Sequence, residues 1–142
     1  MTTPPDFPEP VTGPAYGPFF RFLATAMLLA VLAVGLRSAL GIPPGDAAAQ
    51  GYLVIGLGVA GILGSYWVLM ASTTTVDSTG IQQGGLIEKK VAWHEVRSAR
   101  AFGPAFARRL MVRTLNGRIR FFFCGSPELR AAFDRVAQAY RR

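Results

Sequence analysis

The sequence predicts an α+β membrane protein, in which a hairpin of two transmembrane helices precedes a small antiparallel β domain with a C-terminal amphipathic helix. Two long apolar runs lie in the first half of the 142 residues, and a single soluble core does not explain them. Short alternating segments separated by glycine fill most of the second half, as expected for antiparallel strands. The last segment carries apolar residues at helical spacing, which is typical of a helix that covers a sheet.

The first 18 residues contain six prolines. Proline restricts the backbone and lacks the N–H group that helices and sheets use, so this composition resists both kinds of structure. Residues 1–18 are therefore predicted to form a disordered, proline-rich tail.

Residues 19–40 and 51–71 are predicted to be the transmembrane helices. The second run has no charged residue, and 21 helical residues reach about 31 Å, enough to cross the hydrocarbon core of a bilayer. The first run carries Arg21 and Arg37 near its two ends, where the side chains can extend toward opposite headgroup layers. Residues 41–50 contain two prolines and two glycines and form a short turn, so residues 19–71 make a hairpin.

The distribution of Lys and Arg predicts the orientation of this hairpin. The turn at 41–50 has none, whereas residues 72–142 carry thirteen basic against five acidic residues. This bias places the turn outside the cell and both termini in the cytoplasm, as in a two-pass protein of the inner (plasma) membrane. A cleaved signal peptide ending near Ala47–Ala49 is the alternative, and the acidic, unusually long segment before Arg21 argues against it.

Small residues recur along the second helix at Gly56, Ala60 and Gly64. Such a stripe lets another helix approach closely, and the tethered first helix is favoured as its partner over a second copy of the chain. Tyr66 and Trp67 lie near the cytoplasmic end, where amphipathic rings act as interfacial anchors.

Six short strands are predicted in the basic half, at residues 73–77, 81–83, 86–91, 96–102, 108–115 and 118–124. The pair Asn116-Gly117 suits the two-residue type I′ turn of a hairpin. Alternation along the two arms of this hairpin predicts one core face and one basic face. Ser126-Pro127-Glu128 starts the closing helix with an N-cap, a proline and an acidic first turn. The core is predicted to contain Trp93, Val96, Leu110, Val112, Phe121, Phe123, Leu129, Phe133 and Val136.

Residues 72–142 resemble the small bacterial PH-like domains that are attached to two transmembrane helices. The resemblance rests on the turn at Gly80-Ile81, the segment from Lys90 to Val96 with its Trp93, the Asn116-Gly117 hairpin and the closing helix. It implies a partly open antiparallel β-barrel or sandwich plugged by the helix, in a cytoplasmic PH-like domain. The fuller fold has seven strands where this half of the chain offers six, so one strand is either missing or merged with another.

The sequence offers no convergent set of catalytic groups, so an enzyme is not expected. His94 is the only histidine, and a solvated turn residue is the simpler interpretation than a proton-transfer group. Cys124 continues an apolar run and is expected to be a small buried residue. No zinc-ligand spacing and no phosphate-binding glycine loop is present, so no metal site and no cofactor are predicted.

The remaining feature is a cluster of basic side chains on one hairpin. The candidate contacts to an anion or partner are Arg108, Arg109, Arg113, Arg118 and Arg120. We expect a non-enzymatic, membrane-anchored interaction module that binds a protein partner or the anionic inner leaflet, although the same charges also suit a merely solvated face. The alternative is an accessory or regulatory subunit of a larger membrane complex. Nucleic acid is an unlikely partner because Phe121 and Phe123 are assigned to the core, which leaves few aromatic side chains for bases.

Overall fold

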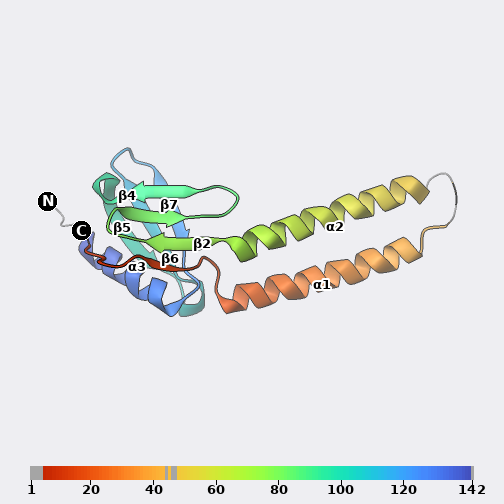
Figure 1. Cartoon of the computed structure of the whole chain (residues 1–142), viewed down its shortest axis with the longest axis horizontal. Coiled ribbons are helices and arrows are strands. Elements are labelled where there is room, and N and C mark those ends of the chain that lie inside the picture. The colour runs from red at the N-terminus through yellow and green to blue at the C-terminus, as the bar shows by residue number, and fades with distance from the viewer. Residues whose placement is uncertain (1–4, 44, 46–47, 142) are drawn as a thin grey trace.

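Two long helices extend from one end of a small β domain (Figure 1). The computed structural model describes residues 5–43, 45 and 48–141. Helix α1 spans Pro18–Leu40 and α2 spans Ala48–Ala71. Both helices are long and apolar enough to cross a membrane, as predicted, and at 1.5 Å per residue they measure about 34 and 36 Å. Three residues of the predicted turn, at positions 44, 46 and 47, lie outside the described residues.

The proline-rich tail forms part of the β domain, and the prediction of disorder is wrong for its described residues. Strand β1, Val11–Pro14, pairs antiparallel with β2, Thr73–Val76. Ahead of the strand, the Phe7 side chain is buried, with only 3% of its surface exposed. Proline is compatible with this role because β1 is the first strand of its sheet, and an edge strand has backbone positions that need no N–H donor. Residues 1–4 of the predicted tail lie outside the described part of the chain.

Because β1 pairs with β2, the helical hairpin is an insertion within the sequence of the β domain. Pro14 lies opposite Thr73 in the sheet, and the Ala15 N–H donates to the Ser72 carbonyl at 3.0 Å. The chain therefore leaves the sheet, runs along α1 and α2, and returns to the position from which it left. The predicted domain boundary at residue 72 is wrong in consequence, because the β domain includes chain from both sides of the helices.

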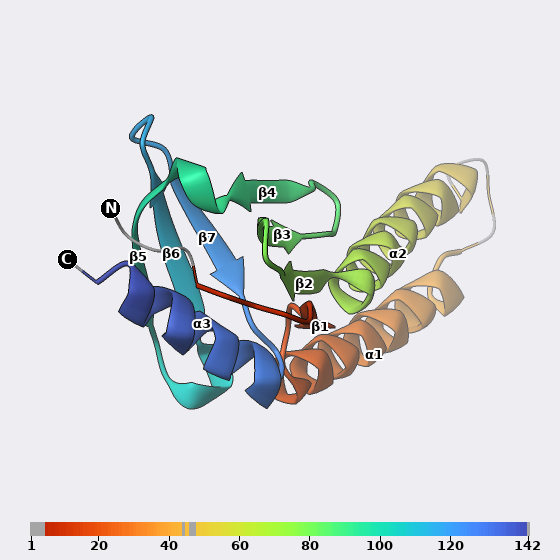
Figure 2. The same ribbon diagram turned by 60° about the vertical axis from the view of Figure 1, so that its left-hand side comes forward.

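In the described part of the chain, seven strands form two antiparallel sheets, whose arrangement Figure 2 shows. The four-stranded sheet has the order β1-β2-β3-β4, with β3 at Gly80–Gln83 and β4 at Lys89–Ala92. The three-stranded sheet has the order β5-β6-β7, with strands Val96–Phe102, Arg109–Thr114 and Ile119–Phe123. All six predicted strands are present, and β1 is the additional one. Strand β4 begins three residues later than predicted, which leaves Leu86 and Ile87 in a loop.

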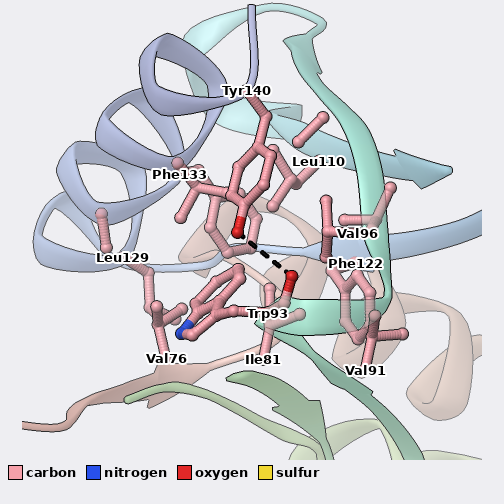
Figure 3. Close-up of a cluster of buried hydrophobic side chains, with 14 of the residues drawn as sticks. Val76, Ile81, Val91, Trp93, Val96, Leu110, Phe122, Leu129, Phe133 and Tyr140 are labelled. Atoms are coloured by element: carbon pink, nitrogen blue, oxygen red, sulfur yellow. Dashed lines mark hydrogen bonds between the residues drawn. The ribbon is translucent and has the colours of Figure 1, made fainter. Parts of the chain in front are cut away.

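Helix α3, Pro127–Ala139, packs on the core as predicted. Its first turn is capped by the Ser126 hydroxyl, which accepts from the Leu129 N–H at 3.3 Å. Figure 3 shows the side chains of Leu129 and Phe133, on α3, and of Tyr140, directly after it, pointing into the cluster around Trp93. The Tyr140 hydroxyl donates to the Trp93 carbonyl at 3.2 Å.

Three aromatic rings from distant parts of the chain stack in this core. Trp93 lies between Phe7 and Tyr140, with ring centroids 6.3 and 6.2 Å away. Its indole N–H donates to the Asp77 carbonyl at 2.8 Å, so the polar end of the ring is satisfied. The stack joins the N-terminal segment, the turn before β5 and the end of α3.

The turn between β6 and β7 differs from the predicted type. Thr114 N–H donates to the Arg118 carbonyl at 2.9 Å, so three residues rather than two form the loop. Gly117 has φ +75°, whereas no described residue other than glycine has a positive φ. A type I′ turn would need positive φ at Asn116 as well, while a three-residue loop needs only one residue in the left-handed region.

One extra loop residue reverses the two faces of β7. Leu110 lies opposite Phe122, and Met111 lies opposite Phe121. Side chains of opposite residues share a face and a one-residue shift exchanges the faces, so Phe122 enters the core with none of its surface exposed. The prediction of Phe121 and Phe123 as core residues is therefore wrong. The other predicted core residues are buried: Trp93, Val96, Leu110, Val112, Leu129, Phe133 and Val136.

Candidate functional site

The five arginines of the candidate contact set do not share one face. Arg109 and Arg113 lie on the side of β6 that points away from the core, and Arg118 is exposed at the hairpin turn. Arg120 lies opposite the buried Val112, so it projects from the core side of β7 and is half-buried. The prediction of a single basic hairpin face is thus wrong for part of the set.

Arg108 is committed to an ion pair with helix α3. Its guanidinium lies 2.6 Å from the Asp134 carboxylate, and both side chains are partly exposed. The pair lies in the wall of an open groove of about 660 Å³ between β5 and α3. Because each partner neutralises the other, Arg108 contributes little free positive charge to the hairpin.

The surface that results from the observed register is named here the outer sheet face. It consists of three rows of opposite residues on β5, β6 and β7: Ser98–Arg113–Ile119, Arg100–Met111–Phe121 and Phe102–Arg109–Phe123. Three of the nine residues are arginines and none is acidic. Phe102, Ile119 and Phe121 expose 42, 52 and 42% of their surfaces, so exposed apolar side chains and arginines lie next to one another on one face.

Direct contacts organise the aromatic side chains of the outer sheet face. The rings of Phe102 and Phe121 meet edge to face at 6.2 Å, and the Arg109 guanidinium lies 5.1 Å from the centroid of Phe123. The ring of Tyr16, which precedes α1, lies 5.5 Å from the ring of Phe123. Phe123 therefore connects this face to the start of the helical hairpin.

Sequence reasoning missed Arg100, Phe102 and Phe121 as members of this face. Arg100 and Phe102 occupy alternate positions of the predicted strand 96–102, which is the signal that would have placed them on one face. Phe121 was assigned to the opposite side of its strand because of the assumed turn. The predicted register leaves only Phe122 of β7 on the basic surface, whereas the observed register places Phe121 and Phe123 there.

The small-residue stripe on α2 does not pack against α1. A Cβ atom added at Gly35 of α1 would contact Val59 and Ile55 at 3.5 and 3.8 Å, whereas one added at Gly56 or Gly64 would meet nothing within 4 Å. The predicted packing of the stripe inside the hairpin is therefore wrong, and this side of α2 faces outward.

Polar contacts join the two helices near the β domain. The Thr25 and Tyr66 hydroxyls lie 3.0 Å apart, and the Arg21 guanidinium donates to the Met70 carbonyl at 3.3 Å. Trp67 exposes 73% of its surface at this end of α2, which suits the predicted role of an interfacial anchor.

The structure also places His94 and Cys124, the two other side chains considered for chemistry. His94 is exposed in the turn before β5. Cys124 is buried, and its burial raises the pKa of the thiol, which makes it a weaker nucleophile at neutral pH. Within residues 5–43, 45 and 48–141, no three His, Cys, Asp or Glu side chains lie close enough to hold a metal ion.

Comparison of the chain with models of protein families, with curated protein sequences and with solved structures finds no match.

Proposed function

We propose that this chain is a non-enzymatic, membrane-anchored PH-like module whose outer sheet face binds an acidic protein partner. The observation that carries the proposal is the clustering of exposed arginine and aromatic side chains on that face. Interfaces favour this composition, since arginine and aromatic residues are enriched at binding hot spots.

The helical hairpin supports the anchoring role. Two apolar helices of about 34 and 36 Å cover a hydrocarbon core of about 30 Å. The basic residues of the chain are concentrated in the β domain, which favours a cytoplasmic location for that domain and for both termini.

The arrangement of strands supports the PH-like assignment. A four-stranded and a three-stranded antiparallel sheet, followed by a helix that packs on the core, agree with the architecture that the resemblance implies. The strand that the second half of the chain lacked is β1, which precedes the helices.

An acidic protein suits the outer sheet face better than the inner leaflet does. Figures 1 and 2 place the β6–β7 turn at the end of the domain away from α1 and α2. Arg113 lies four residues beyond Arg109 along β6, about 13 Å nearer the turn. That separation exceeds the screening length of about 8 Å at physiological ionic strength, so a flat membrane near Arg109 would attract Arg113 only weakly.

The test is a crosslinking pull-down of the full-length chain from native membranes. The variant Arg109→Gln/Arg113→Gln/Phe121→Ser should lose a partner that the unmodified chain retains. The control Arg97→Gln/Arg135→Gln removes the same number of exposed charges elsewhere on the β domain and should retain it. Equal recovery with both variants would contradict the assignment of this face.

A second arm separates the protein partner from the inner leaflet. The full-length chain is placed in nanodiscs of neutral lipid and mixed with acidic vesicles that contain no protein. We expect no association that depends on Arg109 and Arg113. Salt-sensitive binding that disappears in the outer-face variant would instead make the leaflet the ligand of this surface.

An accessory subunit of a larger membrane complex is the second candidate, and the outward stripe on α2 favours it. Gly56→Ile/Gly64→Ile fills the stripe and should release the chain from such a complex in native gel electrophoresis. Gly58→Ile is the matched control, because a Cβ at Gly58 also meets nothing within 4 Å but points to another side of the helix. Unchanged migration of the stripe variant would remove this candidate.

A further inference from the structure

The loop between β3 and β4 starts directly beside the end of α2. Gly84 N–H donates to the Thr73 carbonyl at 2.9 Å, and a Cβ atom at Gly85 would come within 2.8 Å of the Ser72 hydroxyl. Ser72 is the first residue after α2, and its hydroxyl donates a hydrogen bond to the Val68 carbonyl at 2.6 Å. Figures 1 and 2 show the loop extending from the β domain toward the helices.

Two apolar side chains form the tip of this loop. Leu86 exposes 81% and Ile87 exposes 70% of its surface, more than any other large apolar side chain described in the β domain. The following residue, Glu88, holds the loop to the sheet through a hydrogen bond from the Gln82 side chain. Leu86 and Ile87 are therefore presented on a short, fixed loop, and nothing in the described fold covers them.

A second apolar tip lies beside the start of α1. Phe106, in the turn between β5 and β6, exposes 59% of its surface and meets the Phe19 ring at 5.7 Å. Phe19 is the second residue of α1. The two helix ends next to the β domain are thus each flanked by an exposed apolar side chain of that domain.

We propose that Leu86, Ile87 and Phe106 insert into the interfacial layer of the membrane that α1 and α2 cross. Helices of about 34 and 36 Å exceed the hydrocarbon thickness by a few Å, which places their ends in the headgroup layer. Apolar side chains beside those ends reach the boundary between headgroups and acyl chains, where Leu and Phe partition favourably. The occupant of this surface is the lipid bilayer itself, because the helices hold the tips against it.

This contact gives the β domain a defined orientation. If only its connections to α1 and α2 held the β domain, the domain could tilt relative to the membrane. Membrane contacts of Leu86 and Ile87 beside α2 and of Phe106 beside α1 resist this tilt. The inference rests on the proposed membrane crossing of α1 and α2, and it keeps the outer sheet face exposed to partners.

The experiment uses the full-length chain in vesicles of phosphatidylcholine and phosphatidylglycerol. Cys124→Ala removes the only cysteine. An environment-sensitive fluorophore is then attached to Ile87→Cys, to Leu57→Cys in α2, or to Leu115→Cys in the β6–β7 turn. Lipids with a nitroxide close to the headgroup serve as quencher for the probes at Ile87 and Leu115. Lipids with a nitroxide deep in the acyl chain serve for the probe at Leu57, which lies in the middle part of α2. We expect the probe at Ile87 to show blue-shifted emission and several-fold stronger quenching than the probe at Leu115, which is also exposed.

Each further outcome has one meaning. An unquenched probe at Ile87 together with a quenched probe at Leu57 would overturn the inference and leave the membrane crossing intact. Unquenched probes at both sites would overturn the crossing as well. A probe at Ile87 that is shielded from aqueous iodide but not quenched by lipid would show that a protein covers the loop, which also overturns the inference.

A sequence variant tests whether the apolar tip drives insertion. With the probe at Ile87, adding Leu86→Ser should reduce lipid quenching, whereas the matched change Leu115→Ser should leave it unchanged. Equal quenching in the two variants would overturn the role of Leu86.

Discussion

The N-terminal segment is expected to be essential for the stability of the β domain, and Phe7 is the residue that tests this most directly. Its side chain is 97% buried against Trp93. Replacing a buried phenylalanine by alanine typically costs about 3 to 5 kcal/mol. A domain of this size has a total stability of about 5 to 10 kcal/mol, so Phe7→Ala should remove a large share of it.

The measurement is made on a soluble variant that the sheet topology suggests. Ala15 and Ser72 are hydrogen-bonded neighbours, so an Asn-Gly turn can join them and replace residues 16–71. Urea unfolding of this variant should be cooperative, and Phe7→Ala should lower its unfolding free energy by about 3 kcal/mol. The control Phe106→Ala changes an exposed ring and should cost less than about 1 kcal/mol.

A fragment that begins at Ser72 lacks β1 and Phe7 altogether. We expect it to show no cooperative transition, because the Trp93 ring and the edge of β2 lose their partners. A fragment that unfolds with the same midpoint and slope as the joined variant would refute the reasoning that β1 belongs to the domain.

Three further predictions concern the hairpin, the β2–β3 turn and the topology. In the joined variant, Phe122→Ala should cost about 3 to 5 kcal/mol and Phe121→Ala less than about 1 kcal/mol in urea unfolding; a larger cost for Phe121→Ala than for Phe122→Ala would contradict the three-residue loop and favour the two-residue turn. The Thr79 hydroxyl donates to the Asp77 carboxylate at 2.6 Å and lowers the pKa of that carboxyl below its ordinary 3.8. The contribution of Asp77 is therefore complete above about pH 4 and lost as the pH falls through the lower folded pKa. Unfolding midpoints of Asp77→Asn should fall less steeply below pH 4 than those of the unmodified domain, and equal slopes would exclude this role. Reporters fused to the two termini should be active on the cytoplasmic side and a reporter in residues 41–50 on the other side; an external C-terminus would reverse the orientation.

Local sequence patterns were sufficient to locate some elements and faces of the fold and insufficient for others. The alternation of Leu110 and Val112 located β6 and its buried face, because the strand period of two is a local property. The pair Asn116-Gly117 located the turn but not its length. Two-residue and three-residue loops both accept glycine at the last position, and the difference of one residue decided which phenylalanines of β7 were buried.

The proline-rich tail illustrates a limit of composition. Its prolines correctly argue against a helix and against a central strand, but an edge strand needs only half of its backbone groups for pairing. Whether β1 forms depends on the exposed edge of β2, which is 59 or more residues away along the chain. No local pattern in residues 5–18 carries that information.

The sequence by itself determined the two apolar helices, the six strands of the second half and the amphipathic face of α3, because each follows from the composition or periodicity of one segment. Only the tertiary structure decided the seventh strand, the register of the β6–β7 hairpin and the outward direction of the α2 stripe. It also brought Arg100, Phe102 and Phe121 together on the outer sheet face, and Leu86 and Phe106 beside the helix ends. These features depend on which distant segments meet, and the free energy that selects them comes from packing between elements rather than from the preferences of any one of them.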